Sequence, residues 1–185
     1  EGPSEFIATA VVHNGLIYCN IGQDPEHGEG IGNFLVIDTT KTGDVSPQLV
    51  DDKGTTVTDN PDHAVVWNYA KTNRSICTPA VPDGLIYTGA FSGFIYCIDA
   101  KTGELVWKHD TLSHIWGSPL VADGKMYIGN EDGDMLVFAT GREKKLLNTV
   151  TFPDPIYSSP IAADGVLYVA TTTQLYAISS KVGAE

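Results

Sequence analysis

The chain carries one short sequence pattern four times. In each copy an Asn or Asp precedes a Gly, and a Tyr stands three residues after that Gly. The copies are TAVVHNGLIYCNIG (9–22), TPAVPDGLIYTGAF (78–91), SPLVADGKMYIGNE (118–131) and SPIAADGVLYVATT (159–172). Their turn glycines, Gly15, Gly84, Gly124 and Gly165, are separated by 69, 40 and 41 residues. An Asn-Gly or Asp-Gly pair between β-rich segments predicts a tight hairpin turn with positive φ at both central residues.

Each copy continues into further β-rich segments. A third strand follows at FLVID (34–38), FIYCID (94–99), DMLVF (134–138) and LYAIS (175–179), and a Thr-Gly turn leads to an outer strand. A period of about 40 residues with four strands is typical of a β-propeller blade. The sequence therefore predicts an all-β fold, a β-propeller of four-stranded antiparallel blades with about four blades present. We place the blades at 5–72, 73–112, 113–152 and 153–185 of a single propeller segment.

The first and last units differ from the middle two. The first holds insertions at 22–33 and 41–64, and the last has no outer strand. Open blade ends expose sheet edges and apolar faces. We therefore expect a partial propeller, for example half of an eight-bladed ring that the remaining blades of a longer chain complete. A dimer of two arcs and a closed four-bladed ring are the alternatives.

Two tryptophans occupy matching places in the repeat. Trp67 and Trp107 each stand 11 residues before the next inner-strand entry, at Thr78 and Ser118. We expect both rings to be buried between neighbouring blades. An ungapped offset of 40 residues places Leu147 opposite Trp107 in the following unit.

The composition excludes several functional classes. The net charge is −12 over 185 residues, and such a surface repels nucleic acids and anionic membranes. No apolar run reaches the ~20 residues of a membrane helix, so membrane insertion is not expected. Cys19, Cys77 and Cys97 lie in apolar strand patterns and form no Cys-x-x-Cys motif, so we interpret them as small core residues.

Strand order places the blade connectors and the loops between second and third strands on one face of the propeller. Loops on a rigid scaffold often carry function. Where the inner strands begin, one position is always small, which predicts crowding of these strands near the axis: Ala8, Cys77, Gly117 and Ser158. The position before it is always large, as in Trp116 and Tyr157, and two positions before the large residue stand Arg74 and His114. We therefore take Arg74, His114, Trp116 and Tyr157 as ligand-binding candidates at the channel mouth, since Arg pairs with carboxylates and Trp offers a stacking surface. Blade packing with a local ion pair at Arg74 is the alternative interpretation.

The first insertion is acidic. QDPEHGEG places Asp24, Glu26, His27 and Glu29 within six positions, and such side chains can bind calcium or zinc. They are our metal candidates. A solvated loop and a protein-contact loop are the alternatives.

The strings DAKTGELVW and SPLVADGKMYIGNEDGDMLVF resemble the pyrroloquinoline-quinone-type propeller repeat of quinoprotein alcohol dehydrogenases. The same blades occur in many non-catalytic bacterial exported proteins, including an outer-membrane assembly lipoprotein. The resemblance implies a periplasmic or extracellular location. It leaves two functions open: a non-catalytic binding or assembly scaffold with a protein partner, or part of an oxidoreductase that binds pyrroloquinoline quinone and calcium. The dehydrogenases use an adjacent-Cys disulfide and a catalytic Asp, and this sequence has no Cys-Cys pair. We therefore favour the scaffold.

Overall fold

The repeats fold into successive antiparallel sheets. The computed structural model describes residues 4–5, 7–23 and 31–179. The first sheet contains β1 (Ser4–Glu5), β2 (Val11–His13), β3 (Leu16–Gln23), β4 (Ile31–Asp38) and β7 (Val65–Asn73). The second contains β8 (Leu85–Gly89), β9 (Phe94–Asp99) and β10 (Leu105–Asp110). The third contains β11 (Leu120–Ala122), β12 (Lys125–Gly129), β13 (Asp134–Ala139) and β14 (Leu146–Thr151). The fourth contains β15 (Ile161–Ala163), β16 (Val166–Ala170) and β17 (Leu175–Ser179).

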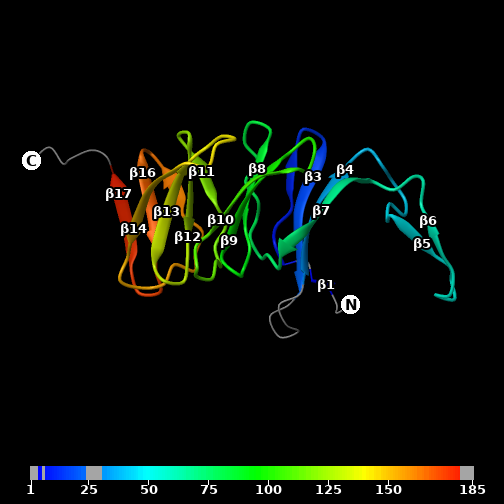
Figure 1. Ribbon diagram of the computed structural model, residues 1–185, viewed down its shortest axis with the longest axis horizontal. Helices are drawn as coiled ribbons and strands as arrows, with labels where there is room; N and C mark the ends of the chain where they lie inside the picture. Colours follow the sequence, from blue (N-terminus) through cyan, green and yellow to red (C-terminus); the bar gives the residue numbers. More distant parts are fainter. Residues whose placement is uncertain (1–3, 6, 24–30, 180–185) are drawn as a thin grey trace, which may run out of the picture.

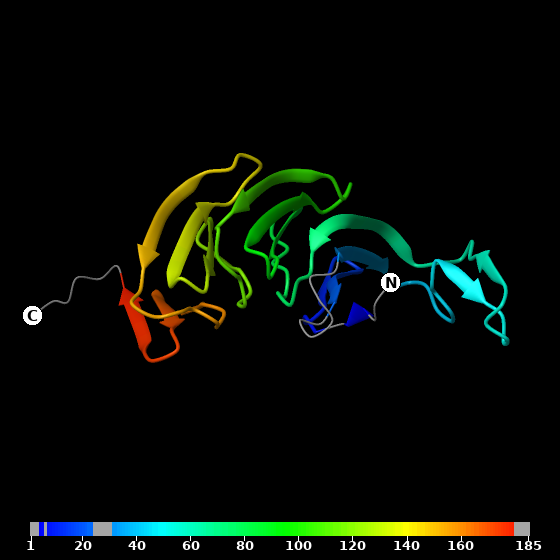
Figure 2. The same ribbon diagram turned by 60° about the horizontal axis from the view of Figure 1, so that its bottom comes forward.

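The four sheets stand face to face along an open arc (Figures 1 and 2). The sheet of β3 and the sheet of β17 lie at opposite ends, so the closed four-bladed ring is not formed. The second insertion forms a hairpin of β5 (Gln48–Val50) and β6 (Val57–Asp59) that projects from the first sheet. The structure is that of a partial β-propeller.

The hairpin turns have the predicted backbone. Asn14, Asp83, Asp123 and Asp164 have φ of 48°, 47°, 50° and 51°, and the glycine after each also has positive φ. Asn and Asp tolerate this left-handed region better than other side chains, and glycine adopts it freely. The repeated turn chemistry therefore sets the hairpin register that starts each sheet.

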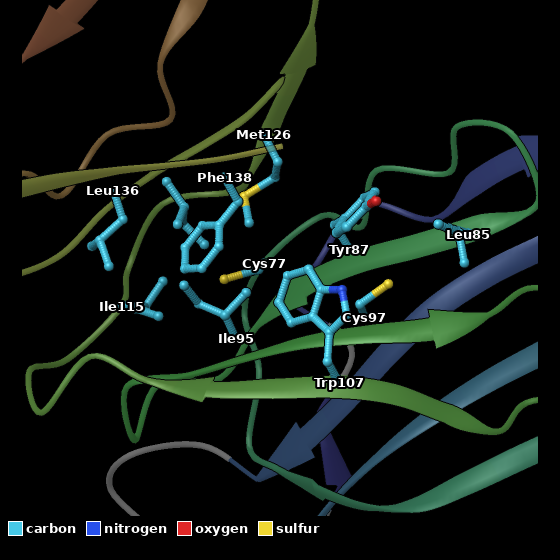
Figure 3. Close-up of a cluster of buried hydrophobic side chains, with 11 residues drawn as sticks. Cys77, Leu85, Tyr87, Ile95, Cys97, Trp107, Ile115, Met126, Leu136 and Phe138 are labelled. Atoms are coloured by element: carbon cyan, nitrogen blue, oxygen red, sulfur yellow. The ribbon is translucent and has the colours of Figure 1, made fainter. Parts of the chain in front are cut away.

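The core lies between the sheets. Between the second and third sheets, Tyr87, Ile95 and Phe138 are fully buried with Ile115 and Met126 (Figure 3). A second cluster joins the first and second sheets, and a smaller one joins the third and fourth. The second and third sheets therefore each bury both faces against their neighbours, as the inner blades of a propeller require.

The inner strands crowd together, as their small residues predict. A Cβ atom built on Gly117 would lie 2.4 Å from the backbone oxygen of Ser158. Real Cβ atoms do not approach so closely, and for this reason the position admits only glycine here.

Both tryptophans pack between sheets. Trp107 is 7% exposed, stacks on Phe138 of the third sheet at 5.5 Å and lies 5.8 Å from Tyr87. Trp67 is half-buried and stacks on Phe34 at 5.8 Å. The prediction of buried inter-blade indoles is confirmed for Trp107 and holds in part for Trp67.

The predicted match of Leu147 with Trp107 is wrong. Trp107 pairs with Cys97, whereas the strand position one repeat later, Val137, pairs with Asn148. The connection between β13 and β14 spans 140–145, one residue more than the 100–104 connection of the second sheet. This extra residue shifts the outer strand, so Asn148 takes the tryptophan position and Leu147 lies in the β-bulge.

Candidate functional site

Arg74 follows β7 directly and enters the connector to the second sheet. Its side chain is buried, with 4% exposure, and its guanidinium carbon lies 4.1 Å from the ring centre of Phe91. The backbone N–H of Phe91 donates a 2.8 Å hydrogen bond to the Arg74 carbonyl, which holds the two residues together. Among the described residues, no acceptor lies within hydrogen-bonding distance of Arg74 Nε or Nη2.

The two unpaired donors of Arg74 form the edge of the guanidinium that recognises carboxylates. Nε and Nη2 lie on one edge of the planar guanidinium, and this edge binds a carboxylate through two parallel hydrogen bonds. Leaving a buried guanidinium without an acceptor is costly, because its charge has lost water and gained no counter-charge. The arrangement is therefore suited to an anionic group, such as a carboxylate.

Aromatic rings surround Phe91. The His114 ring stacks on Phe91 with centroids 4.5 Å apart, and Trp116 meets Phe91 edge to face at 4.8 Å. Tyr157 lies 5.4 Å from Trp116 on the next connector. Such edge and offset contacts are favourable between aromatic rings. The rings link two blade connectors and the loop that holds Phe91 into one cluster.

Glu131 holds the cluster from its other side. Its Oε2 accepts a hydrogen bond from Trp116 Nε1 and contacts His114 Nδ1, both at 3.1 Å, and its Oε1 accepts one from the Tyr157 hydroxyl at 3.3 Å. The Trp116 N–H is the largest cause that holds the pKa of Glu131 below its ordinary value, with His114 and Tyr157 contributing less. Glu131 is thus a charged acceptor that orients the three rings.

A cavity of about 320 Å³ opens beside this cluster. It is lined by Ser92, Leu112, Ser113, His114, Glu131 and Asp132. The walls of this cavity are mainly polar. The side-chain cluster therefore presents an aromatic and hydrogen-bonding surface next to an open hollow. We call this cluster the rim cluster; it consists of Arg74, Phe91, His114, Trp116, Glu131 and Tyr157.

The structure brings together all four ligand-binding candidates of the sequence analysis: Arg74, His114, Trp116 and Tyr157. Their role in binding remains a prediction. The alternative of a local ion pair at Arg74 finds no partner among the described residues. Glu5 lies in β1.

Sequence reasoning did not single out Phe91 and Glu131. Both stand in the loops between second and third strands, AFSG (90–93) and NEDG (130–133), which strand order had assigned to the same face. The repeat offset of 40 residues places Phe91 and Glu131 at equivalent positions of these loops, and this equivalence is the sequence signal that could have found them.

The metal candidates Asp24, Glu26, His27 and Glu29 lie outside the described residues. In the part of the chain that is described, no group of three or more His, Cys, Asp or Glu side chains is placed to hold a metal ion. Residues 4–5, 7–23 and 31–179 also contain no helix that could span a bilayer.

The three cysteines are free, buried thiols: Cys19 lies in β3, Cys97 in β9, and Cys77 in the connector between β7 and β8. Cys77 and Cys97 are fully buried, and burial raises the pKa of each to about 12. Such thiols carry almost no thiolate at neutral pH and are poor nucleophiles. They serve as small core residues.

Comparison with known proteins decides the family. Residues 51–185 match the profile of the family described as outer membrane protein assembly factor BamB. The chain belongs to this family. Its blades are therefore PQQ-like propeller repeats, as the resemblance predicted.

Relatives with curated descriptions match over shorter stretches. The quinohemoprotein alcohol dehydrogenase of Comamonas testosteroni is 30% identical over 103 residues, which cover 48% of this chain and 14% of the dehydrogenase. The beta-alanine-activating enzyme of Danio rerio is 26% identical over 99 residues, covering 49% of this chain and 8% of that enzyme. The chain thus spans a small fraction of the length of these relatives.

Solved structures share the fold. BamB from Moraxella catarrhalis has a TM-score of 0.60 at 16% identity, and the match covers 96% of this chain and 60% of BamB. The Comamonas dehydrogenase has a TM-score of 0.60 at 21% identity, covering 90% of this chain and 29% of the dehydrogenase. The designed protein Ika4 has a TM-score of 0.64 at 14% identity, and the match covers 97% of this chain and 93% of Ika4.

Proposed function

We propose that this protein is a non-catalytic propeller scaffold that binds an acidic segment of a protein partner at the rim cluster. The supporting observation is the buried Arg74 guanidinium, whose Nε and Nη2 face no acceptor among the described residues. A carboxylate would satisfy both donors at once. The aromatic rings of Phe91, Trp116 and Tyr157 would then contact the neighbouring side chains of the partner, since aromatic residues dominate the energetics of many interfaces.

The family supports this role. Its description names an outer membrane assembly factor, and assembly factors act by binding other proteins. We extend the proposal to an exported protein that works in the periplasm, in keeping with that description.

The described residues do not fit pyrroloquinoline quinone with its calcium ion. No group of three or more His, Cys, Asp or Glu side chains is placed among them to hold a metal ion, and the cysteines are separate buried thiols rather than an adjacent pair. We therefore derive no oxidation step for this chain. Addition of the quinone with calcium, followed by absorbance and thermal melting, tests the oxidoreductase alternative, and a saturable shift in both would favour it.

Binding at the rim can be tested with matched short ligands. The peptide acetyl-Phe-Glu-amide should bind in calorimetry, and acetyl-Phe-Gln-amide should not, because only the first carries the carboxylate. Arg74→Met should abolish binding while the thermal midpoint stays equal or rises, since Met keeps the apolar stem and removes the unpaired charge. Equal binding of both peptides, or a large loss of stability in Arg74→Met, would contradict the proposal and indicate a structural arginine.

Specificity for Arg74 requires a control at the second arginine. Arg142 already binds Asp99 at 2.7 Å and lies away from the rim cluster. Arg142→Met should therefore leave peptide binding unchanged. Arg74→Lys should weaken binding at least tenfold, because an ammonium keeps the charge but loses the two-donor edge.

A further inference from the structure

The interface between the third and fourth sheets contains an apolar cavity of about 520 Å³. Its lining includes Tyr127, Met135, Val137, Val150, Phe152 and Ile178. This cavity is distinct from the rim cluster, with which it shares no residue.

In the preceding interface the equivalent space is filled by an indole. The Trp107 ring lies against Tyr87 and Phe138, and Trp107 pairs with Cys97 on the adjacent strand. One repeat of 40 residues later, the positions of Tyr87, Cys97 and Phe138 are held by Tyr127, Val137 and Ile178. All three of these residues line the cavity. The cavity is therefore the tryptophan slot of the third blade.

Asn148 takes the place of the tryptophan and does not fill the slot. It pairs with Val137 as Trp107 pairs with Cys97. Its Oδ1 accepts a 2.9 Å hydrogen bond from the backbone N–H of Thr149, which holds the short side chain against its own strand. All six residues of β14 are exposed, whereas Trp107 in β10 is 7% exposed.

The slot keeps an apolar wall and a charged edge. Val150 and Ile178 are 40% and 43% exposed, so apolar surface faces the empty space. The cavity is continuous with the packed inter-sheet cluster of Met135 and Phe152. At its edge the Lys125 ammonium already pairs with Asp123 at 3.0 Å. No unpaired charge among these lining groups therefore calls for a charged ligand.

We propose that this slot binds a neutral planar aromatic group of indole size. The occupant is the same chemical group that fills the two preceding interfaces, Trp67 in one and Trp107 in the other. The volume of about 520 Å³ is ample, because a cavity of roughly 150 Å³ accepts benzene and typical ligand pockets run from roughly 300 to 1,000 Å³. Binding removes the apolar wall from water and restores the packing that the indoles provide elsewhere.

Methyl NMR on the unmodified protein tests the site without any substitution. Indole added in the millimolar range should shift the methyl signals of Val137, Val150 and Ile178, and leave those of Val11 and Val12 in the first sheet unchanged. Absence of shifts, or shifts that lie mainly outside the third interface, would overturn the proposal.

A substitution that fills the slot gives a second, independent test. Asn148→Trp should raise the thermal midpoint and weaken indole binding at least tenfold, since the new ring occupies the site. Asn148→Ala, the matched control, should keep indole binding within about twofold, because Asn148 contributes no wall. A folded Asn148→Trp protein that binds indole as well as the wild type would contradict the assignment of the slot.

Discussion

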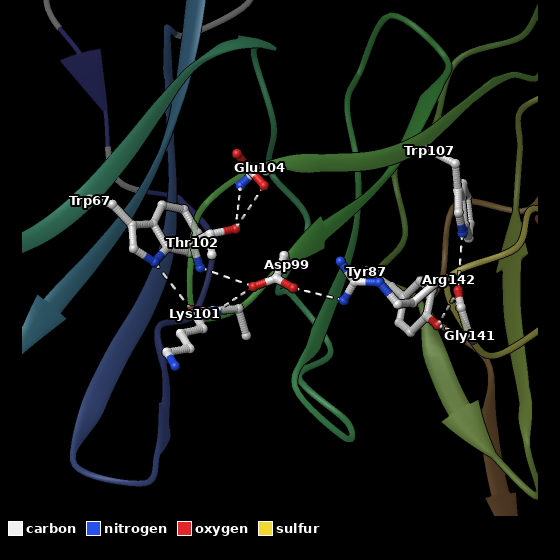
Figure 4. Close-up of polar contacts among 10 residues, drawn as sticks. Trp67, Tyr87, Asp99, Lys101, Thr102, Glu104, Trp107, Gly141 and Arg142 are labelled. Atoms are coloured by element: carbon white, nitrogen blue, oxygen red, sulfur yellow. Dashed lines mark hydrogen bonds and ion pairs between the residues drawn. The ribbon is translucent and has the colours of Figure 1, made fainter.

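The indole nitrogen of Trp107 donates a 3.1 Å hydrogen bond to the carbonyl oxygen of Gly141, in the turn of the next sheet. The backbone N–H of Gly141 in turn donates to the Tyr87 hydroxyl at 2.7 Å (Figure 4). One sheet earlier, Trp67 makes the same kind of bond to the Ala100 carbonyl at 3.2 Å. The outer-strand tryptophan of one blade thus ties that blade to the turn of the next.

Replacing Trp107 by Ala should lower the free energy of unfolding by ~3–5 kcal/mol, the cost of removing a buried aromatic ring. The loss combines the apolar burial with the unpaired carbonyl of Gly141. Urea denaturation followed by circular dichroism measures it. Val12 is 69% exposed, so Val12→Ala should change stability by less than about 0.5 kcal/mol. A Trp107→Ala loss as small as that of the control would disprove the inter-blade role.

Acid should release the contact between the second and third sheets at Asp99. The Arg142 guanidinium, 2.7 Å away, and the N–H groups of Thr102 and Lys101 lower the pKa of Asp99 from 3.8 to about 2. A lowered carboxyl pKa gives stability that is present above pH 4 and is lost as the pH falls from about 4 to about 2. Carboxyl carbon NMR should report the low pKa, and Arg142→Met should raise it toward 3.8. An Asp99 pKa that is the same in both proteins would contradict the ion pair.

The rim cluster should loosen when Glu131 is protonated. Because its folded pKa lies below the ordinary value, the contacts to Trp116 and Tyr157 persist above that ordinary value and are lost as the pH falls through the lowered pKa. The indole N–H signal of Trp116 should therefore move with this titration. Glu131→Gln should abolish the pH dependence. A Trp116 signal that titrates equally in both proteins would show that another group controls it.

The cysteines should resist modification in the native state. Cys77 and Cys97 are fully buried with pKa values of about 12, and burial also raises the pKa of Cys19. Mass spectrometry after iodoacetamide at pH 8 should find no alkylation, and three modified sites after denaturation. Rapid labelling of the folded protein would show that a blade opens more readily than its packing implies.

Sequence reasoning predicted those features of the fold that the residue types at the turns and inner strands determine. The four Asn/Asp-Gly turns have positive φ at both positions, so the register of the hairpin in each sheet followed from the sequence. The crowding at Gly117 followed from the small residues at equivalent positions. The turns depend on residues close together in the chain, and the crowding between Gly117 and Ser158 depends on the repeat of small residues at one blade position.

The errors arose where one residue changes a register or where two loops meet in space. An extra residue in the 140–145 connection moved Asn148 rather than Leu147 into the tryptophan position. Nothing in an ungapped alignment reveals this, because both strands remain β-rich. At the rim cluster, Phe91 reaches His114 and Glu131 reaches Tyr157 across a blade boundary, and such contacts depend on how far the sheets turn about the axis.

Nitrogen-15 NMR of the arginine side chains tests the central claim most directly. The chain contains only two arginines, so two Nε–H signals are expected, and Arg142 serves as the internal reference because Asp99 already holds it. Titration with benzoate should shift the Arg74 Nε–H signal downfield until the shift saturates. The Arg142 Nε–H signal should change only by the small shift that added salt causes. Benzamide, which lacks the carboxylate, should shift neither signal. Equal small shifts of both signals with benzoate would contradict a carboxylate-binding rim at Arg74.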